Sequence, residues 1–182
     1  MNNSPIYWNK AKKQLMKKDK VMKKLIKKYS DKNLTTRKDV FFSLCKSIIG
    51  QQISVAAANS VFTKFKLTCK GKINPKNVNL LKTSNLKKCG LSRQKVKGIK
   101  ELSKKFLNKS FNPKLINNMT DEEAIEYLSS LRQIGKWSAE MILLFTYNRP
   151  NIWPIQDIGL LRAISNNYKK KIFAAKKFFR KT

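Results

Sequence analysis

One carboxylate in this chain, that of Asp157, has mostly apolar and aromatic neighbours in the sequence. Asp157 lies in residues 153–160, WPIQDIGL, where aromatic and branched apolar side chains surround it. An ionised carboxylate is costly to place among such side chains unless it is paired or used. It could stabilise positive charge that develops on a substrate, or it could only cap a following helix. Asp157 is therefore a candidate functional residue, with the helix cap as the alternative.

A candidate phosphate-binding turn precedes this carboxylate. Residues 128–140 have the pattern of a helix, a tight turn at residues 133–135 (QIG) and a second helix, and Trp137 lies twenty residues before Asp157. Such a turn directs backbone N–H groups outward at the start of the second helix, where the helix dipole favours a phosphate. A contact of this kind reads no base sequence.

Several other chemistries are excluded by composition. The chain has no histidine, and its three cysteines, Cys45, Cys69 and Cys89, form no CxxC pair. A zinc site or an imidazole-based triad therefore has no ligands or base to use. We interpret the cysteines as small core residues with reduced thiols.

The charge balance points to a polyanion as partner. Lys and Arg number 41 against 10 Asp and Glu, a formal net charge of +31. Neutralising phosphates releases counterions, so nucleic acid is the first candidate partner and an anionic membrane the second. The alternative is that the lysines only solvate the surface. Their distribution argues against this, because no acidic residue lies between Asp39 and Glu101, whereas five lie between Asp121 and Glu140.

The apolar content predicts a folded protein without membrane spans. Hydrophobic residues make up 41% of the chain, enough for a core. The longest uninterrupted apolar run, residues 141–145, is far shorter than a spanning helix needs. The lysine-rich N-terminus does not resemble a secretory signal. We expect a soluble, intracellular protein located in the cytoplasm.

The first half of the chain shows helical periodicity. Residues 7–29 mix apolar residues with ten lysines and predict one basic amphipathic helix. Residues 41–49 have apolar side chains at helical spacing, Gly50 interrupts them, and residues 53–65 resume the pattern after Gln51-Gln52. The sequence thus predicts a helix, a tight junction and a helix.

The second half continues in the same way. Gly90 suits the end of a short helix, and residues 96–106 predict an amphipathic one. Residues 120–123 (TDEE) form a capping box, residues 137–147 are apolar enough to be nearly fully buried, and residues 148–150 (NRP) end that helix. Because no alternation of β type is found, we predict an all-α bundle of about eight short helices.

Three segments together resemble one known family. They are residues 48–54 (IIGQQIS), residues 134–139 (IGKWSA) and residues 153–160, with Gly90-Leu91-Ser92 and Lys95 between the first two. In this order they resemble the helix-hairpin-helix DNA glycosylases, specifically the 3-methyladenine DNA glycosylase II branch, over residues 40–164.

The resemblance implies a fold and an activity. The fold would be a two-lobed helical bundle with a DNA-binding cleft, formed by residues 1–182 as a single glycosylase domain. The activity would be to flip an alkylated base from duplex DNA and hydrolyse its N-glycosidic bond, with Asp157 as the catalytic residue. Because Trp137 occupies the position of the lysine nucleophile found in strand-cleaving relatives, the resemblance implies a monofunctional enzyme. We expect no cofactor, no membrane partner and a monomer.

The resemblance also implies residue roles. The minor-groove wedge would fall on the Gln51-Gln52 junction. The residues predicted to contact DNA are Gln51, Gln52, Ser54, Gln133, Ile134, Gly135, Lys136 and Ser138. The predicted substrate pocket consists of Trp137, Trp153, Tyr147 and Phe42. A monovalent cation would bind the backbone carbonyls of Ser129 and Leu131.

Two departures from the family pattern carry consequences. Gln133 stands where the family usually has glycine, which predicts a positive φ at this residue. The family usually continues after the catalytic aspartate with a helix bearing a tryptophan, a proline and an arginine-serine pair, and this helix is not found. We expect that either the chain is truncated or residues 166–182, with seven basic residues and no acidic one, do a reduced version of its job. The alternative function is a catalytically weak or inactive helix-hairpin-helix DNA-binding protein. A bifunctional glycosylase/lyase ranks third, since no four-cysteine iron–sulfur pattern exists.

Overall fold

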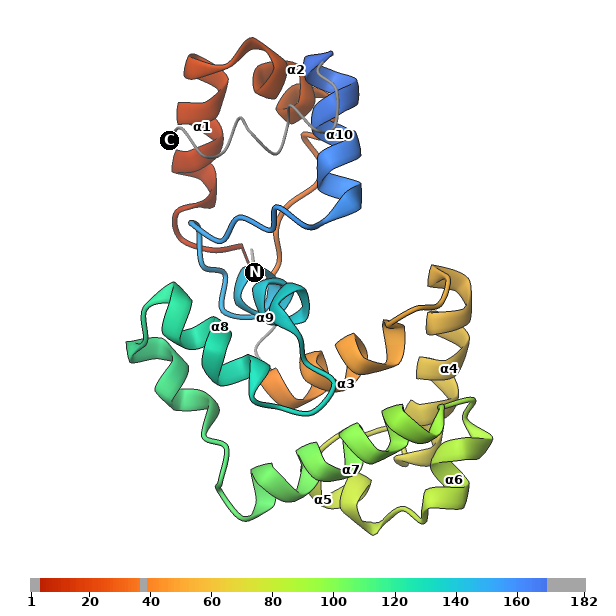
Figure 1. Cartoon of the computed structure of the whole chain (residues 1–182). Coiled ribbons are helices and arrows are strands. Elements are labelled where there is room, and N and C mark those ends of the chain that lie inside the picture. The colour runs from red at the N-terminus through yellow and green to blue at the C-terminus, as the bar shows by residue number, and fades with distance from the viewer. Residues whose placement is uncertain (1–3, 37–38, 170–182) are drawn as a thin grey trace. The chain divides into compact units, whose positions relative to one another are not determined.

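The computed structural model describes residues 4–36 and 39–169, and within these ranges it contains helices and no strand (Figure 1). The all-α prediction is therefore confirmed. The chain divides into two compact units: unit 1 comprises residues 1–36 and 148–182, and unit 2 comprises residues 37–147. No helix in the described ranges is long and apolar enough to cross a membrane.

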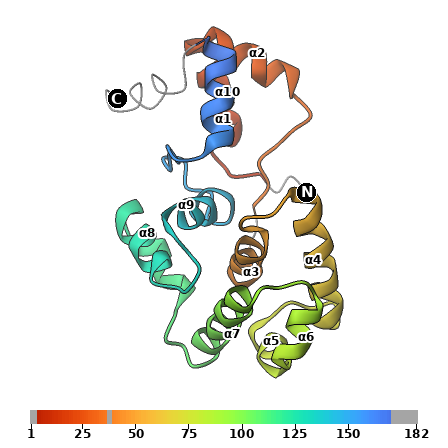
Figure 2. The same ribbon diagram turned by 45° about the vertical axis from the view of Figure 1, so that its right-hand side comes forward.

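Unit 2 is a bundle of short helices. Its elements are α3 (Val40–Gly50), α4 (Val55–Thr68), α5 (Pro75–Leu80), α6 (Thr83–Lys88), α7 (Arg93–Leu107), a 3-10 helix (Pro113–Asn118), α8 (Asp121–Ser129) and α9 (Lys136–Phe145). Helix α7 packs against α3, α5 and α6, and α8 pairs with α9 (Figures 1 and 2).

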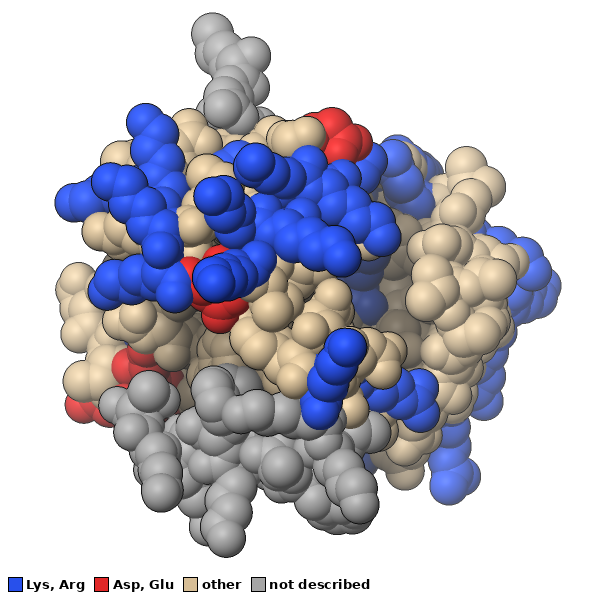
Figure 3. Space-filling model, turned by 90° about the horizontal axis from the view of Figure 1, so that it is seen from above, with Lys and Arg blue, Asp and Glu red and all other residues tan. Residues whose placement is uncertain are grey.

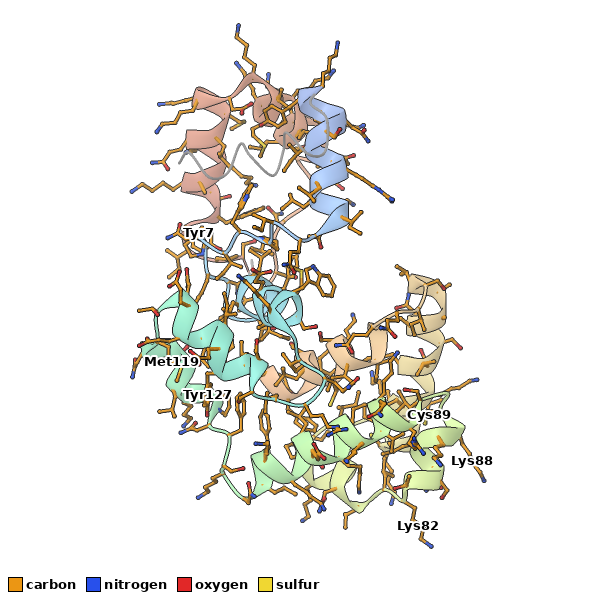
Figure 4. All side chains as sticks on the ribbon, in the orientation of Figure 1. Tyr7, Lys82, Lys88, Cys89, Met119 and Tyr127 are labelled. Atoms are coloured by element: carbon orange, nitrogen blue, oxygen red, sulfur yellow. The ribbon has the colours of Figure 1, made fainter. Side chains whose placement is uncertain are left out.

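The core of unit 2 follows from the apolar periodicity of its sequence. Leu44 and Ile48 of α3 and Ile99 of α7 are fully buried. The ring of Phe111 stacks at 4.8 Å on the ring of Tyr127, which Figure 4 labels on α8. The ring of Phe106 on α7 contacts those of Phe41 on α3 and Phe111, at 5.1 and 5.3 Å between centroids. Aromatic contacts thus join α3, α7 and α8 around one core, as the amphipathic pattern requires.

Two local predictions in unit 2 are confirmed. The Thr120 hydroxyl accepts from the Glu123 amide at 3.2 Å, and the Glu123 carboxylate accepts from the Thr120 amide at 2.8 Å, so the capping box begins α8. Gly90 has a φ of +94° just after α6 ends at Lys88. Both features depend on neighbours in sequence, which explains why the sequence predicts them.

Unit 1 contains α1 (Trp8–Lys18), α2 (Lys20–Lys28) and α10 (Ile158–Tyr168). The prediction of one helix over residues 7–29 is wrong. Asp19 is extended, with a φ of −138°, and its side chain accepts from the Met22 amide at 2.9 Å. It therefore ends α1 and caps α2, because a short acidic side chain competes for the amides that a continuous helix would use.

Long-range hydrogen bonds connect the distant chain segments of unit 1. The Tyr168 hydroxyl at the end of α10 donates to Asp19 Oδ2 at 2.7 Å, and the Tyr7 hydroxyl donates to Asn148 O at 2.8 Å. Burial and the bond to Asp19 raise the pKa of Tyr168 to about 12. The same bond lowers the pKa of Asp19.

The number of helices differs from the prediction. The described ranges form ten α-helices and one 3-10 helix instead of about eight helices. Asp19 adds one, and the short helices α5 and α6 occupy a stretch where the sequence shows turn signals. Residues 166–168 of the basic C-terminal segment belong to α10, and the rest of that segment, from residue 170 on, lies outside the described residues.

Candidate nucleic-acid interface

Unit 2 has a shallow hollow of about 690 Å³ where two turns meet. One turn connects α3 to α4, and the other connects α8 to α9. The residues that line it are Gln51, Gln52, Ser129, Ser130, Leu131, Arg132, Gln133, Ile134, Gly135, Trp137 and Ser138. The hollow thus brings together six of the eight residues predicted to contact DNA, from positions more than 80 residues apart in sequence.

The turn between α8 and α9 has the predicted hairpin geometry. The Ile134 amide donates to Leu131 O at 3.0 Å, and Gln133 has a φ of +68°. The positive φ inferred for Gln133 is therefore confirmed. No side chain caps the N-terminus of α9, and a Cβ added to Gly135 would have no neighbour within 4 Å. An anion can approach the first-turn amides of α9 closely at this open position.

The turn between α3 and α4 exposes Gln52. This residue also has a left-handed backbone, with a φ of +58°, and its side chain is exposed. Ser54 caps α4 by accepting from the Ala57 amide at 3.2 Å. The local reason for the turn is therefore a helix that ends at Gly50 and a new one that Ser54 begins two residues after Gln52.

Gln51 links the two turns directly. Its Nε2 donates to Gln133 O at 2.6 Å and to the Ser138 hydroxyl oxygen at 3.3 Å. The amide group thus bonds the hairpin while the backbone of Gln51 belongs to the other turn. This arrangement fixes the position of Gln52 relative to the start of α9.

Helix α7 lies close to both turns that line the hollow, with Lys95 near one and Gly98 near the other. Lys95 Nζ donates to Ile49 O at 2.8 Å and to Gln51 O at 2.7 Å, satisfying carbonyls at the end of α3. Burial lowers the pKa of the Lys95 ammonium. One turn further along α7, a Cβ added to Gly98 would lie 2.8 Å from Gln133 Cγ.

These α7 contacts were missed by the sequence reasoning. In the sequence, Lys95 stands out only as part of the family resemblance, and Gly98 is not predicted to have a role. The available signal was a glycine in the middle of an otherwise regular amphipathic helix, which indicates a close approach of another segment.

Asp157 begins α10 in unit 1. Its Oδ1 accepts from the Leu160 amide at 2.7 Å, and its own amide donates to Pro154 O at 2.9 Å. A Cβ on Gly159 would lie 3.1 Å from Oδ1, so glycine at that position leaves room for the carboxylate. The helix-cap role is therefore real. It does not by itself exclude a catalytic one.

The surroundings of Asp157 are apolar at the surface. Trp153, Ile155 and Ile158 expose 47%, 39% and 62% of their surface. Large apolar side chains gathered on an exposed segment commonly mark a contact surface. A helix cap alone does not require such neighbours.

The predicted pocket aromatics have different environments. Trp137 is 42% exposed and lines the hollow, and Met141, Leu144, Phe145 and Tyr147 are half-buried, so the prediction that residues 137–147 are nearly fully buried is only partly correct. The Tyr147 hydroxyl donates to Pro113 O at 2.8 Å. Phe42 packs edge-on against Phe62 with ring centroids 5.2 Å apart. The substrate-pocket roles of these aromatics and of Trp153 stay predictions.

The structure also shows the surroundings of Lys136 and of the predicted cation site. Lys136 is exposed at the first position of α9, and burial raises the pKa of Glu140 four residues later. The monovalent-cation site at the carbonyls of Ser129 and Leu131 stays a prediction; Leu131 O already accepts from the Ile134 amide, so a cation would share that oxygen.

Comparison with known proteins identifies the family. The sequence profile described as HhH-GPD superfamily base excision DNA repair protein matches residues 45–180. The chain belongs to this superfamily.

Two named yeast proteins are similar to this chain in sequence. The chain is 27% identical to DNA-3-methyladenine glycosylase 1 of Schizosaccharomyces pombe, over 80% of this chain and 64% of that protein. It is 30% identical to the alkylbase DNA glycosidase-like protein mag2 of the same yeast, over 84% of this chain and 75% of that protein.

A solved structure has the same fold. The 3-methyladenine DNA-glycosylase from Archaeoglobus fulgidus superimposes with a TM-score of 0.76 at 26% identity, over 92% of this chain and 61% of that one. The chain thus spans less than two thirds of the length of two of these three similar proteins.

Proposed function

We propose that this protein is a monofunctional DNA glycosylase that hydrolyses the N-glycosidic bond of alkylated bases, of the 3-methyladenine type, in duplex DNA. The observation that carries the proposal is Asp157, a carboxylate at the head of α10 beside exposed Trp153, Ile155 and Ile158. The activities named for the two yeast relatives support the substrate class.

The chemistry needs little more than one placed carboxylate. An alkylated purine already carries positive charge and leaves readily without a general acid, so the enzyme must chiefly stabilise the oxocarbenium-like sugar. Opposite charges about 4 Å apart interact by about 4 kcal/mol at an effective dielectric constant of about 20. That energy is worth several powers of ten in rate. A chain without histidine can therefore catalyse this reaction.

Unit 2 supplies the binding functions in this proposal. The uncapped first turn of α9 binds a DNA phosphate, with Lys136 as an added cation. The exposed Gln52 fills the gap left by the extruded base. Because Trp137 replaces a lysine nucleophile, hydrolysis proceeds without a covalent adduct.

The proposal is tested by Asp157→Asn. Asparagine caps helices as well as aspartate does, so this variant keeps the bond to the Leu160 amide and removes only the charge. We expect base release from alkylated duplex DNA to fall by at least about a hundredfold, while affinity for the same duplex holds. Asp157→Ala is the matched variant that removes cap and charge together, and it should also lose thermal stability.

The products are as informative as the rate. Wild-type protein should leave an intact abasic strand that breaks only after alkali, and borohydride should trap no adduct. Wild-type release by Asp157→Asn would refute the catalytic assignment, and a trapped adduct would point to Lys136 or another amine. If wild-type protein binds the duplex but releases no base, the alternative of an inactive DNA-binding protein replaces the proposal.

A further inference from the structure

The lysines of α1 and α2 are gathered on the outer faces of these helices. On α1, Lys10, Lys13 and Lys17 follow the i, i+3, i+7 spacing of one helix face, and on α2, Lys20, Lys24 and Lys27 follow the equivalent i, i+4, i+7 spacing. All six are exposed. Figure 3 shows the molecule from above, and Lys and Arg side chains crowd one part of this face, with a few Asp and Glu side chains among them. We call these six residues the α1–α2 lysine surface.

Few acidic residues oppose this charge in the part of unit 1 that the structure describes. Neither α1 nor α2 contains an acidic residue. Of the nearby acids, Asp19 accepts from the Met22 amide and the Tyr168 hydroxyl, and Asp31 pairs with Lys32 at 2.8 Å. Like charges three and four residues apart on a helix repel one another. The surface therefore carries positive charge that the described part of unit 1 does not compensate, and binding a polyanion would reduce the repulsion between these lysines.

The apolar faces of the same two helices are turned toward each other. Trp8 and Leu15 of α1 and Leu25 and Ile26 of α2 line one groove of about 230 Å³. The indole of Trp8 also donates to Asn33 Oδ1 at 3.2 Å, which ties α1 to the segment after α2. A helix that binds a membrane surface inserts its apolar face into the lipid. None of the six lysines lines this groove. The charged surface thus lies apart from the apolar side chains, and a phosphate backbone needs only the charge, which favours a nucleic acid as the partner.

We propose that the α1–α2 lysine surface is a second DNA-contacting surface, which binds the phosphate backbone without reading sequence and is independent of the turns of unit 2. The proposal rests on the proposed function only in taking DNA as the polyanion. Flexible lysines bind phosphates mainly by releasing counterions, so the contribution of this surface falls steeply as salt rises.

The experiment compares two variants with the same net charge. In the first, Lys10, Lys13, Lys17 and Lys24 are replaced by Gln. In the control, the four exposed lysines of unit 2 on or beside α5 and α6 are replaced by Gln: Lys76, Lys82, Lys87 and Lys88. Affinity for lesion-free duplexes of about one and about three helical turns is measured across a range of salt concentrations. Each contact to duplex DNA contributes about 0.9 to the slope of log affinity against log salt.

We expect the slope for the longer duplex to fall by about 2 to 3 in the α1–α2 variant and by less than about 1 in the control. Equal slopes for the two variants would overturn the proposal, because net charge alone would then explain the binding. Retained DNA binding with lost binding to phosphatidylserine vesicles would also overturn it, in favour of a membrane. Equal thermal stability of the two variants serves as the folding check.

This outcome is separable from that of the proposed function. Lesion-free DNA contains no base to excise, so the salt slope does not depend on Asp157. If Asp157→Asn kept full base release, the catalytic assignment would fail and the slope comparison would be unaffected. If the slopes were equal, only the second surface would fail.

Discussion

The two units differ in how tightly the helices that carry their candidate functional residues are packed. In unit 2, six residues of α3 are buried, and the hollow-lining turns are bonded to α7 and to each other. In the described part of unit 1, α1 and α2 have no buried residue and α10 has only Leu161. The residues of the hollow thus stand on a packed core, whereas Asp157 and the α1–α2 lysine surface stand on a thinly packed unit.

The difference shows how each unit is stabilised. Unit 2 can rely on apolar burial, worth about 25 cal/mol per Å². Unit 1 relies more on specific hydrogen bonds such as those of Tyr168 to Asp19 and of Tyr7 to Asn148. The two turns of the hollow should therefore keep their positions when surface residues are changed, and lose them when one of a few internal contacts is removed. The following predictions test that division.

The largest effect in unit 2 is expected for Gln52→Ala. The side chain is exposed on a left-handed turn, so its loss should change stability little. If Gln52 fills the gap left by a flipped base, base release should fall about 30-fold, because flipping costs a few kcal/mol that the wedge offsets. Affinity for lesion-free duplex should fall less than about threefold, since phosphate contacts supply most of that affinity.

The measurement for Gln52 is single-turnover base release beside equilibrium binding. Equal losses in the two would show that Gln52 packs the turn instead of acting as a wedge. Gln51→Ala is the useful companion, because it breaks the bonds to Gln133 O and Ser138 and should weaken binding as well as release.

A smaller effect, about tenfold on base release, is expected for Lys95→Met. The matched control is Lys100→Met on the same helix. Lys100 Nζ donates to Asn79 O at 2.6 Å and Leu81 O at 2.9 Å, and burial lowers its pKa as it does that of Lys95. Each lysine thus satisfies two carbonyls at the end of a helix, but only Lys95 supports a turn that lines the hollow.

Both lysine variants should lose about 1 to 2 kcal/mol of stability, because each leaves two carbonyls without their donor. Only Lys95→Met should lower base release, measured at a temperature where both variants are folded. Lys95→Arg, which can still donate to carbonyls, should recover part of the activity. Equal activities of Lys95→Met and Lys100→Met would show that Lys95 contributes only to stability.

The structure also shows which features a single sequence can reveal. The capping box of Thr120 and Glu123, the end of a helix at Gly90 and the positive φ of Gln133 depend on neighbouring residues or on one familiar turn, and all are confirmed. The break at Asp19 was missed because the lysine-rich pattern continues through it, and only the competing bond to the Met22 amide decides the outcome.

Contacts between distant segments could not be predicted. The hydrogen bond of Gln51 to Gln133 spans 82 residues, and that of Lys95 to Ile49 spans 46. Neither pairing leaves a periodic signal in the sequence. The exposure of Trp137 was misjudged for a related reason: an apolar run predicts burial on average, whereas the first turn of a helix beside a hollow stays open.

The smallest effect concerns the contact between α7 and the hairpin. Gly98→Ala alone would place a Cβ 2.8 Å from Gln133 Cγ, so it should destabilise the protein. In a Gln133→Gly background that clash disappears, and the remaining neighbour, Arg132 O at 3.5 Å, is at ordinary contact distance. There, Gly98→Ala should stabilise the helix, since alanine is favoured over glycine by about 1 kcal/mol in helix interiors.

Urea unfolding of the wild type, the two single variants and the double variant gives a coupling energy between the two positions, expected to be at least about 1 kcal/mol. Additive changes would show that Gly98 and Gln133 do not interact, so α7 would not hold the hairpin in place, and the contrast between a firmly packed unit 2 and a thinly packed unit 1 would fail at this contact.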